Sequence, residues 1–319
     1  MRIKLITSGK NNLVVKFNYK KKNFIYKKYL KKKRGGIKYS RYKSETLFIN
    51  HLRKKNIKNL PSIIKTNAKT EESIFDYIDG KKIKKISKND ILQCINFIKS
   101  INKKKSKNNI NFKKATEACI SIKDHIETAE KRINMLSKYS KNYGIYKKAK
   151  YFVSRTLKRK MNEVKKEIAK IYSHREIKRK LNKQDLILSP SDFGFHNVIK
   201  KNKKLFFFDF EYAGMDDPVK LMSDFICQPD NKLNKNQTYY FYNNIIKELS
   251  KKNEIAKRFK AVIFIHRIKW CCVILSEILN KRYFERRKFS GSNINIQKCY
   301  DKAVSYYNQY LNKDNLNFF

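Results

Sequence analysis

The sequence predicts an α+β fold in which a small sheet opens the chain and a larger, mainly helical part follows. Up to residue 80, short β-rich runs alternate with polar turns, which is typical of antiparallel strands. Beyond residue 80, apolar residues recur every three or four positions, which predicts amphipathic helices. We therefore expect two lobes, residues 1–80 and residues 81–319, in a chain long enough to bury a substantial core.

The first lobe is expected to be built mostly from strands. Five runs have the composition of short strands: residues 3–6, 13–17, 24–29, 61–64 and 73–78. The turn after the first of them contains Gly9, whose neighbourhood would offer backbone N–H groups to a phosphate. A plain hairpin turn explains the same residues equally well. Asp79 and Gly80 close the last strand with a turn.

One helix is expected within this lobe, over residues 41–54. Its apolar stripe includes Glu45, and a carboxylate that faces a core needs a counter-charge. Lys27, on the run 24–29, is the natural partner, and such a strand-lysine to helix-glutamate ion pair positions the phosphates in kinases. The alternative is that Glu45 lies at the edge of the stripe and is solvated.

Helical periodicity covers most of the second lobe. Ser87 and Asp90 form a capping signal ahead of the first stripe. Residues 115–136 carry apolar positions at steps of three and four, so they are expected to form one long helix. Further helices are expected at residues 157–171, 239–250, 257–280 and 294–311.

The charge of the chain is unusual. It has 77 Lys and Arg against 27 Asp and Glu, a formal net charge of +50. An excess of this size raises the question of nucleic acid or anionic membrane. The Lys residues are spread along the whole chain together with abundant Asn, Ile, Tyr and Phe, a composition that an A/T-biased genome produces. We interpret the charge as a solvated surface, with no specific nucleic-acid partner expected; a polyanion-binding protein is the alternative.

The compartment is predicted from cysteines and hydropathy. The six Cys residues include no C-x-x-C pair and no zinc-type spacing, which indicates buried thiols in a reducing compartment. The N-terminus has no apolar run of signal-peptide length. The most apolar stretch, residues 261–279, is interrupted by His266, Arg267 and Lys269, which predicts a core helix and no membrane span. A cytoplasmic location is expected.

The residues that carry chemistry follow Ser189. Asp192 and Asn197 have the D-x-x-x-x-N spacing by which a kinase catalytic loop provides a proton acceptor and a magnesium ligand. Residues 198–199 and 205–208 predict a hairpin that returns Asp209 beside Asn197, where it would supply a second metal ligand. The simpler interpretation is that Asp and Asn near Gly are turn residues and that an Asp after a strand is a cap.

These motifs resemble the aminoglycoside phosphotransferase and choline kinase superfamily, whose members carry H-G-D-x-x-x-x-N and then I-D-[FW]-E-x-A-G-x-x-D-P. Residues 209–218, Asp-Phe-Glu-Tyr-Ala-Gly-Met-Asp-Asp-Pro, match the second motif closely. In the first motif, Pro190 and Ser191 stand where the family has His and Gly. The family's next Asp falls on Leu221, and whether Asp224 replaces it is left open.

The resemblance implies a two-lobed protein-kinase-like fold and a role for each site residue. Asp192 would orient and deprotonate the acceptor hydroxyl. Asn197 and Asp209 would hold Mg²⁺ against the phosphates of ATP or GTP, while Lys27 neutralises phosphate charge and Glu45 holds Lys27.

The resemblance also places the hinge between the lobes at Asp76, Tyr77 and Ile78, whose backbone would bind the adenine edge. A role for His196 in packing or capping is expected, since Asp192 already serves as the base.

The acceptor is expected to be a small molecule with a hydroxyl group. Only residues 210–216 separate Asp209 from Asp217, which is too short for a peptide-docking segment. The helical stretch between Gly80 and Ser189 is long enough to wall an acceptor pocket. The scarcity of acidic residues favours a sugar or sugar derivative over a choline-like amino alcohol, for which Glu211 and Tyr212 would be the binding residues. A catalytically idle kinase-like protein is the other alternative.

Overall fold

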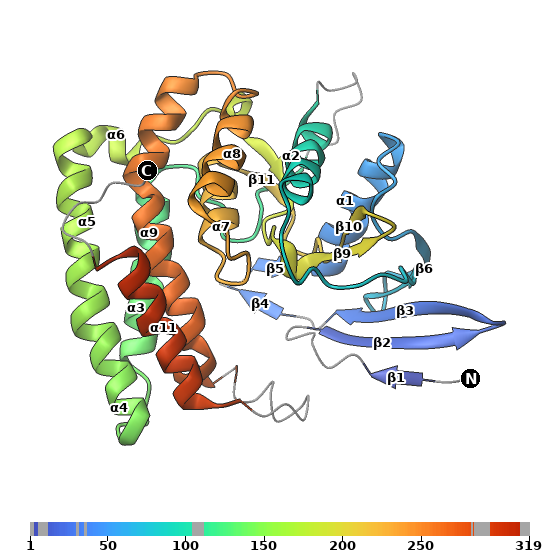
Figure 1. Cartoon of the computed structure of the whole chain (residues 1–319), viewed down its shortest axis with the longest axis horizontal. Helices are drawn as coiled ribbons and strands as arrows, with labels where there is room; N and C mark the ends of the chain where they lie inside the picture. The colour runs from blue at the N-terminus through green and yellow to red at the C-terminus, as the bar shows by residue number, and fades with distance from the viewer. Residues whose placement is uncertain are drawn as a thin grey trace. The chain divides into compact units, whose positions relative to one another are not determined.

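The computed structural model describes residues 3–5, 12–29, 32–34, 37–103, 112–281, 283 and 294–312. Figure 1 labels the helices and strands of the chain. The chain forms two compact units, each assembled from separate segments. Unit 1 comprises residues 1–116, 187–216 and 236–245, and unit 2 comprises the remainder. The α+β prediction is confirmed. The predicted division at residue 80 separates two contiguous lobes, and this division stays a prediction.

The sheet of unit 1 is antiparallel and has five strands. Their order is β1 (Ile3–Leu5), β2 (Asn12–Tyr19), β3 (Lys22–Tyr29), β7 (Glu72–Asp76) and β6 (Ile63–Asn67). In the central strand, Lys27 lies opposite Val14 on β2 and Ser73 on β7. The side chain of Lys27 is buried and that of Lys28 is exposed, as the alternation of a strand requires.

Helix α1 (Arg41–Lys54) has the bounds that the sequence predicts. It begins at Ser40, whose hydroxyl accepts a hydrogen bond from the Lys43 amide and so satisfies one of the free donors of the first turn. Its buried face includes Glu45, Phe48 and Leu52. Strands β4 (Lys32–Arg34) and β5 (Ile37–Tyr39), which the sequence did not predict, pair with each other just before the helix.

Two short strand pairs carry the catalytic motifs. The predicted hairpin is present as β9 (Val198–Lys201) and β10 (Lys204–Phe207). Strands β8 (Ile187–Ser189) and β11 (Gly214–Asp216), which precede and follow the hairpin in the sequence, pair with each other. Helix α2 (Lys88–Asn102) starts with a capping box between Ser87 and Asp90 and packs on β10 and β8. Most of α8 (Lys235–Ile246) also belongs to unit 1.

A cluster of phenylalanine rings anchors these elements. The ring of Phe97 on α2 lies 4.1 Å from Phe207 on β10, 6.0 Å from Phe193 and 6.2 Å from Phe210, measured between ring centroids. Phe210 also lies 4.8 Å from Phe48 on α1. Because these rings are buried, the residues next to them in sequence have fixed backbone positions.

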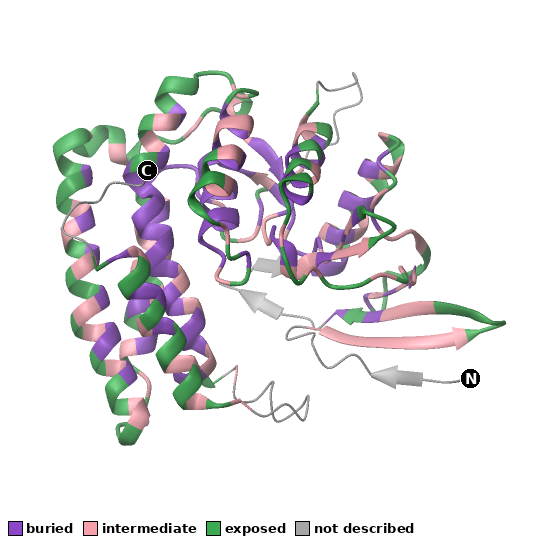
Figure 2. Cartoon of the chain, viewed as in Figure 1, coloured by how far each residue is buried: buried purple, intermediate pink, exposed green. Residues whose placement is uncertain are grey.

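Unit 2 is helical. In its described residues the helices are α3 (Ile122–Ser137), α4 (Gly144–Tyr151), α5 (Lys158–Ile171), α6 (His174–Lys178), α7 (Pro218–Cys227), α9 (Lys252–Leu279) and α11 (Ile296–Tyr310). A π-helical segment covers Phe152–Leu157. Helix α9 packs against α3, α5, α7 and α11 and is buried along most of its length (Figure 2). Of the helices that the structure describes, none is long and apolar enough to span a membrane.

The single long helix expected over residues 115–136 is wrong in its first part. Helix α3 begins at Ile122, because Ser121 caps it through the Asp124 amide. Ala115 instead forms a backbone bond with Met215 on β11, and Glu117 has a left-handed φ of 60° that a helix does not allow. The apolar residues before Ser121 are buried outside any helix, so their spacing imitated a helical stripe.

Candidate active site

The candidate site lies within unit 1 and is centred on Lys27. Its Nζ atom lies 2.7 Å from Oε2 of Glu45 on α1 and 2.6 Å from Oδ1 of Asp209. The ion pair expected between β3 and α1 is therefore present, and the solvated alternative for Glu45 is wrong, since Glu45 is 3 % exposed. Lys28 points the other way and contacts Glu72 at 3.0 Å.

Glu45 holds more than the lysine. Its Oε2 accepts a 2.6 Å hydrogen bond from the Tyr29 hydroxyl, and its Oε1 accepts a 3.1 Å bond from the Phe210 amide. One carboxylate thus fastens β3, α1 and the segment after Asp209 together. Sequence reasoning missed Tyr29, although it follows Lys27 by two residues and so faces the same side of the strand.

The charge on Lys27 is stabilised by its surroundings. Burial opposes the ammonium form, but the carboxylates of Asp209 and Glu45 outweigh burial and raise the pKa of Lys27 well above its ordinary value. Lys27 is therefore a permanent cation at neutral pH. It is held by two carboxylates within a protein that has few of them.

Glu211 is part of the support for this cluster. Its side chain is 1 % exposed, and it accepts a hydrogen bond from Asn12 on β2 and lies 3.8 Å from the Arg41 guanidinium. Burial, with the nearby charge of Asp209, raises the pKa of Glu211 above its usual range. Arg41 also lies over the ring of Tyr212. Glu211 is thus buried among other residues, and the half-buried Tyr212 already packs against the cation of Arg41.

The loop that carries Asp192 is braced by its own residues. The side-chain amide of Asn197 donates to the backbone carbonyl of Asp192 at 2.9 Å. The backbone amide of Asp192 donates to the Pro190 carbonyl at 3.0 Å. His196 Nε2 lies 3.1 Å from Asp192 Oδ1. His196 therefore contacts the proposed base directly, whereas the sequence led us to expect only packing or capping. The signal for it was the i,i+4 spacing of the two residues.

Backbone strain occurs at two positions of the site. Ser191 has φ 67° and Asp209 has φ 67°, both in the left-handed region that favours Gly. Ser191 stands where the family motif has Gly. Its left-handed backbone conformation is one that Gly adopts without strain. Strained non-glycine residues persist where surrounding contacts hold them, and such positions concentrate at functional sites.

Asn197 and Asp209 carry side-chain oxygen atoms of the kind that Mg²⁺ prefers as ligands. The Phe208 amide donates to the Asn197 carbonyl at 3.2 Å, which places Asp209 beside Asn197. The Asn197 side chain uses its nitrogen toward Asp192, which leaves its oxygen for a cation, and Lys27 occupies only one oxygen of Asp209. No group of three or more His, Cys, Asp or Glu side chains in the described part of the chain could hold a metal. The residues therefore fit a Mg²⁺ ion that takes its other ligands from phosphate and water.

The three hinge residues expected at the adenine edge differ in their availability. The Asp76 amide donates to the Ser62 carbonyl at 3.1 Å, and the Tyr77 amide donates to the Asn23 carbonyl at 3.3 Å. The Ile78 amide has no backbone partner among the described residues. Gly9, the candidate for phosphate contact, lies outside the described residues.

Asp224, whose role was left open, is a core residue of unit 2. It sits on α7, where it binds Lys220 at 3.2 Å, His266 at 3.2 Å and Lys269. Burial opposes the charge of Asp224, but Lys269, Lys220 and His266 outweigh burial and lower the pKa of Asp224 well below its ordinary value. Asp224 is thus committed to a buried ion cluster.

Comparison with known proteins places this geometry in a fold class. No protein-family model and no curated protein matches the chain. One similar structure is spectinomycin phosphotransferase, solved in complex with ADP and spectinomycin. The match covers 98 % of this chain and 90 % of that protein, with a TM-score of 0.62 and 14 % identity. Plasmodium vivax ethanolamine kinase matches 97 % of this chain over 81 % of its own, with a TM-score of 0.55 and 15 % identity. The match to a choline kinase from Streptococcus pneumoniae covers 97 % of this chain and 94 % of that kinase, with a TM-score of 0.55 and 14 % identity.

The chain therefore has the fold of the aminoglycoside phosphotransferase and choline kinase structures. At identities of 14 % to 15 % the likeness shows the fold and leaves activity to be argued from the site. The fold class implied by the sequence motifs, a protein-kinase-like arrangement of an antiparallel sheet with one helix and a larger helical part, is confirmed.

Proposed function

We propose that this protein is a kinase that transfers the γ-phosphoryl group of ATP to a hydroxyl group of a small molecule. The observation that carries the proposal is the placement of Lys27 between Glu45 and Asp209, at 2.7 Å and 2.6 Å. In kinases this lysine must be held by the helix glutamate and must lie next to the metal-binding aspartate. A structural ion pair alone would not need Asn197 and Asp209 at the two ends of one hairpin.

Each residue has a role that its surroundings support. Asp192, whose side chain is 40 % exposed, would accept the proton of the acceptor hydroxyl as the new phosphate ester bond forms. Lys27 would neutralise phosphate charge, and Glu45 would keep it in place. Bound through Asn197 and Asp209, Mg²⁺ would supply charge neutralisation for the transferred group.

For the nucleotide, we propose that the Ile78 amide binds the adenine edge, because the amides of Asp76 and Tyr77 are already used. GTP remains the alternative nucleotide. The complex of spectinomycin phosphotransferase with ADP supports nucleotide use by this fold.

The acceptor is proposed to be a sugar or a related polyhydroxylated compound. A choline-like cation would need acidic or aromatic walls. Glu211 is buried against Asn12 and Arg41, and Tyr212 lies beneath Arg41. The positive charge of Arg41 at these two side chains disfavours a cationic acceptor, so the amino-alcohol alternative lacks its two supporting residues.

A screen of acceptors tests the proposal. Consumption of ATP would be measured with sugars, aminocyclitols including spectinomycin, choline, ethanolamine and a generic protein. The account expects turnover with a hydroxylated small molecule, which Asp192→Asn lowers by on the order of a hundredfold. Asp301→Asn, at an exposed aspartate of α11, is the matched control and should leave turnover unchanged. Phosphorylation of the protein substrate alone would contradict the small-molecule assignment.

A further inference from the structure

One face of the continuous helical stretch from α4 to α5 carries tyrosines and cations together. Its exposed residues follow one another at steps of four, four, four and three positions: Tyr143, Lys147, Tyr151, Arg155 and Lys158. Residues three or four positions apart lie on the same face of a helix, so these five side chains form one row, which we call the aromatic-basic stripe. The stripe belongs to unit 2 and contains no residue of the candidate active site.

Both tyrosines of the stripe present their rings to solvent. Tyr143 is 61 % exposed and Tyr151 is 66 % exposed, the two largest values among the large hydrophobic side chains of the described residues. The Tyr143 ring is held by a neighbour, since its centroid lies 5.3 Å from that of Tyr146. Tyr146 is itself held by Tyr139 at 6.0 Å and by the Lys141 ammonium at 4.9 Å. A ring that is already fixed loses little freedom when a partner binds.

The cations of the stripe are not neutralised by acidic residues. Residues 138–158 contain seven Lys and Arg and no Asp or Glu. The side chains of Lys147, Arg155 and Lys158 are exposed and form no ion pair with any described residue. Their charges are therefore open to a partner that carries negative charge.

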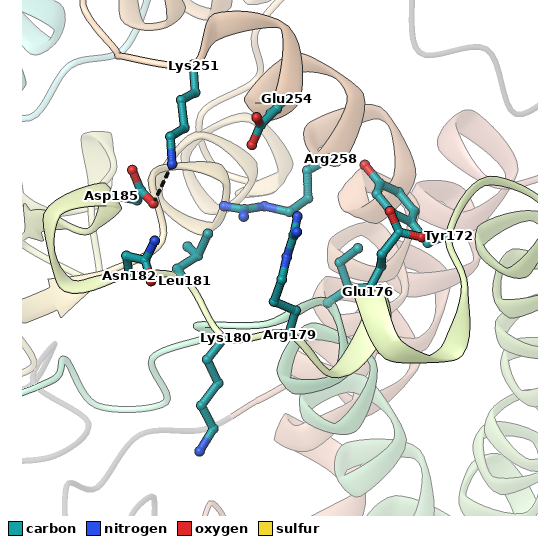
Figure 3. A pocket seen from close by; sticks show the side chains of 11 residues that line it. Tyr172, Glu176, Arg179, Lys180, Leu181, Asn182, Asp185, Lys251, Glu254 and Arg258 are labelled. Carbon is teal, nitrogen blue, oxygen red and sulfur yellow. Dashed lines mark hydrogen bonds and ion pairs between the residues drawn. The ribbon is translucent and has the colours of Figure 1, made fainter.

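The pocket of unit 2 shown in Figure 3 is the contrasting case. Its basic side chains share the wall with three acidic ones, Glu176, Asp185 and Glu254. Asp185 binds Lys251 at 3.0 Å, as the dashed line marks. The charges of that pocket are matched within the protein, whereas those of the aromatic-basic stripe are not.

We propose that the aromatic-basic stripe binds single-stranded nucleic acid, with Tyr143 and Tyr151 stacking on bases and the cations contacting phosphates. The two tyrosines are eight residues apart, which is roughly 12 Å along a helix and spans about three to four nucleotides of a stacked strand. Every base has a π-face, so stacking on tyrosine requires no particular sequence. This agrees with the expectation that the chain has no specific nucleic-acid partner. The stripe is independent of the proposed kinase activity.

The side chains of the stripe suit a single strand better than two other polyanions. A duplex keeps its bases stacked inside and offers no open base face to a tyrosine. An anionic membrane takes up a helix whose apolar face is continuous. The aromatic-basic stripe has cations between its tyrosines, and none of its five positions is aliphatic.

Fluorescence anisotropy of a labelled oligothymidylate tests the stacking. The oligonucleotide has about 12 nucleotides, within the site sizes of single-strand binders, and is titrated with the full chain at constant salt. We expect saturable binding that Tyr151→Ala weakens by about tenfold, or about 1.4 kcal/mol. Tyr239→Ala, at a tyrosine of α8 that is 53 % exposed, is the matched control and should leave the affinity unchanged.

The salt dependence of the same titration tests the cations. Lys147→Gln combined with Arg155→Gln should reduce the slope of log affinity against log salt by about 1.4, or about 0.7 for each lost phosphate contact. Lys65→Gln combined with Lys260→Gln removes two exposed charges elsewhere and should leave the slope unchanged. All four positions are exposed, so the variants should fold.

Three results would overturn the proposal. An equal loss of affinity in Tyr151→Ala and Tyr239→Ala, or an equal change of slope in the two double variants, would show attraction by the net charge of +50 alone. Equal or tighter binding of a duplex of the same sequence would show that no base stacks on the tyrosines. Binding to anionic vesicles that Tyr151→Ala abolishes, without binding to the oligonucleotide, would assign the stripe to a membrane.

Discussion

His196 Nε2 lies 3.1 Å from Asp192 Oδ1, so the proposed catalytic base has a histidine partner four residues along the chain. The family motif places its histidine two residues before the base, where this chain has Pro190. The Asn197 side chain donates to the Asp192 carbonyl, so Asp192 is contacted by two side chains of its own loop. We therefore regard His196 as a positioning residue for Asp192.

Replacement of His196 should lower turnover and leave nucleotide use intact. His196→Ala is expected to reduce kcat by about tenfold, since orientation of a general base is lost while the base itself remains. His196→Gln places an amide nitrogen near the same position and should recover part of the loss. Steady-state kinetics with varied ATP separates the effects: a KM for ATP that rises with the fall in kcat, or no recovery with Gln, would contradict a positioning role.

Loss of Lys27 should cost both stability and ATP binding. Lys27→Met leaves Glu45 buried without its cation, although Tyr29 and the Phe210 amide still donate to it, so the free energy of unfolding should fall by about 3 kcal/mol. Lys28→Met, which removes a half-exposed pair with Glu72, should change it by no more than about 0.5–1 kcal/mol. Urea unfolding and ATP titration measure both, and a larger effect at Lys28 would contradict the assignment.

Ser191→Gly should stabilise the protein. Ser191 has φ 67°, where a residue with a Cβ atom is disfavoured by about 1 kcal/mol relative to Gly. Among the described residues its hydroxyl makes only a 3.4 Å bond to the Thr116 carbonyl, so little is lost with the side chain. Ser191→Ala removes the same hydroxyl and keeps the strain. The Gly variant should melt about 1–2 °C higher than the Ala variant in a chain of 319 residues, and the reverse order would show that the loop is not strained.

A buried chain of hydrogen bonds in unit 2 should make stability depend on pH. His125 Nε2 lies 3.1 Å from Asp217, His125 Nδ1 lies 2.9 Å from His266 Nε2, and His266 Nδ1 lies 3.2 Å from Asp224. Each of these three hydrogen bonds has one donated proton when His125 is charged and His266 is neutral with its proton on Nδ1. Burial opposes the charge of His125, but Cys119 and Asp217 raise the pKa of His125 to about 10, whereas burial and Lys269 lower the pKa of His266 to about 3.

The sign of the effect differs on the two sides of neutrality. A raised pKa for His125 gives stability that is complete below about pH 6.5, the unfolded value, and is lost as the pH rises toward 10. A lowered pKa for His266 gives stability that is complete above about pH 6.5 and is lost as the pH falls toward 3. Unfolding free energy measured against pH should therefore peak near neutrality. His125→Gln should flatten the alkaline limb, and His174→Gln on exposed α6 should not; identical profiles for the two variants would contradict the chain of bonds.

Much of this site could be predicted because its residues lie in regular elements. Helical periodicity predicts the bounds of α1, and the polar turn predicts the hairpin that returns Asp209. The need of a buried carboxylate for a counter-charge predicts the pair of Lys27 with Glu45. Helix α3 was placed too early because buried residues outside a helix can share its spacing. Strands β8 and β11 have three residues each, too few to show any period.

Other parts of the site depend on contacts between distant segments. The bonds of Glu45 to the Phe210 amide and of Glu211 to Asn12 join residues 165 and 199 positions apart in sequence. Residue type and local spacing carry no information about such contacts.

Calorimetric titration with ATP, with and without Mg²⁺, tests the central claim most directly. The account predicts saturable binding that requires Mg²⁺, that loses its metal-dependent part in Asp209→Ala, and that survives in Asp192→Asn, because Asp192 acts on the acceptor and not on the nucleotide. Binding that is the same without Mg²⁺, falls steeply with added salt and is unchanged in Asp209→Ala would contradict the kinase assignment and favour a polyanion-binding surface.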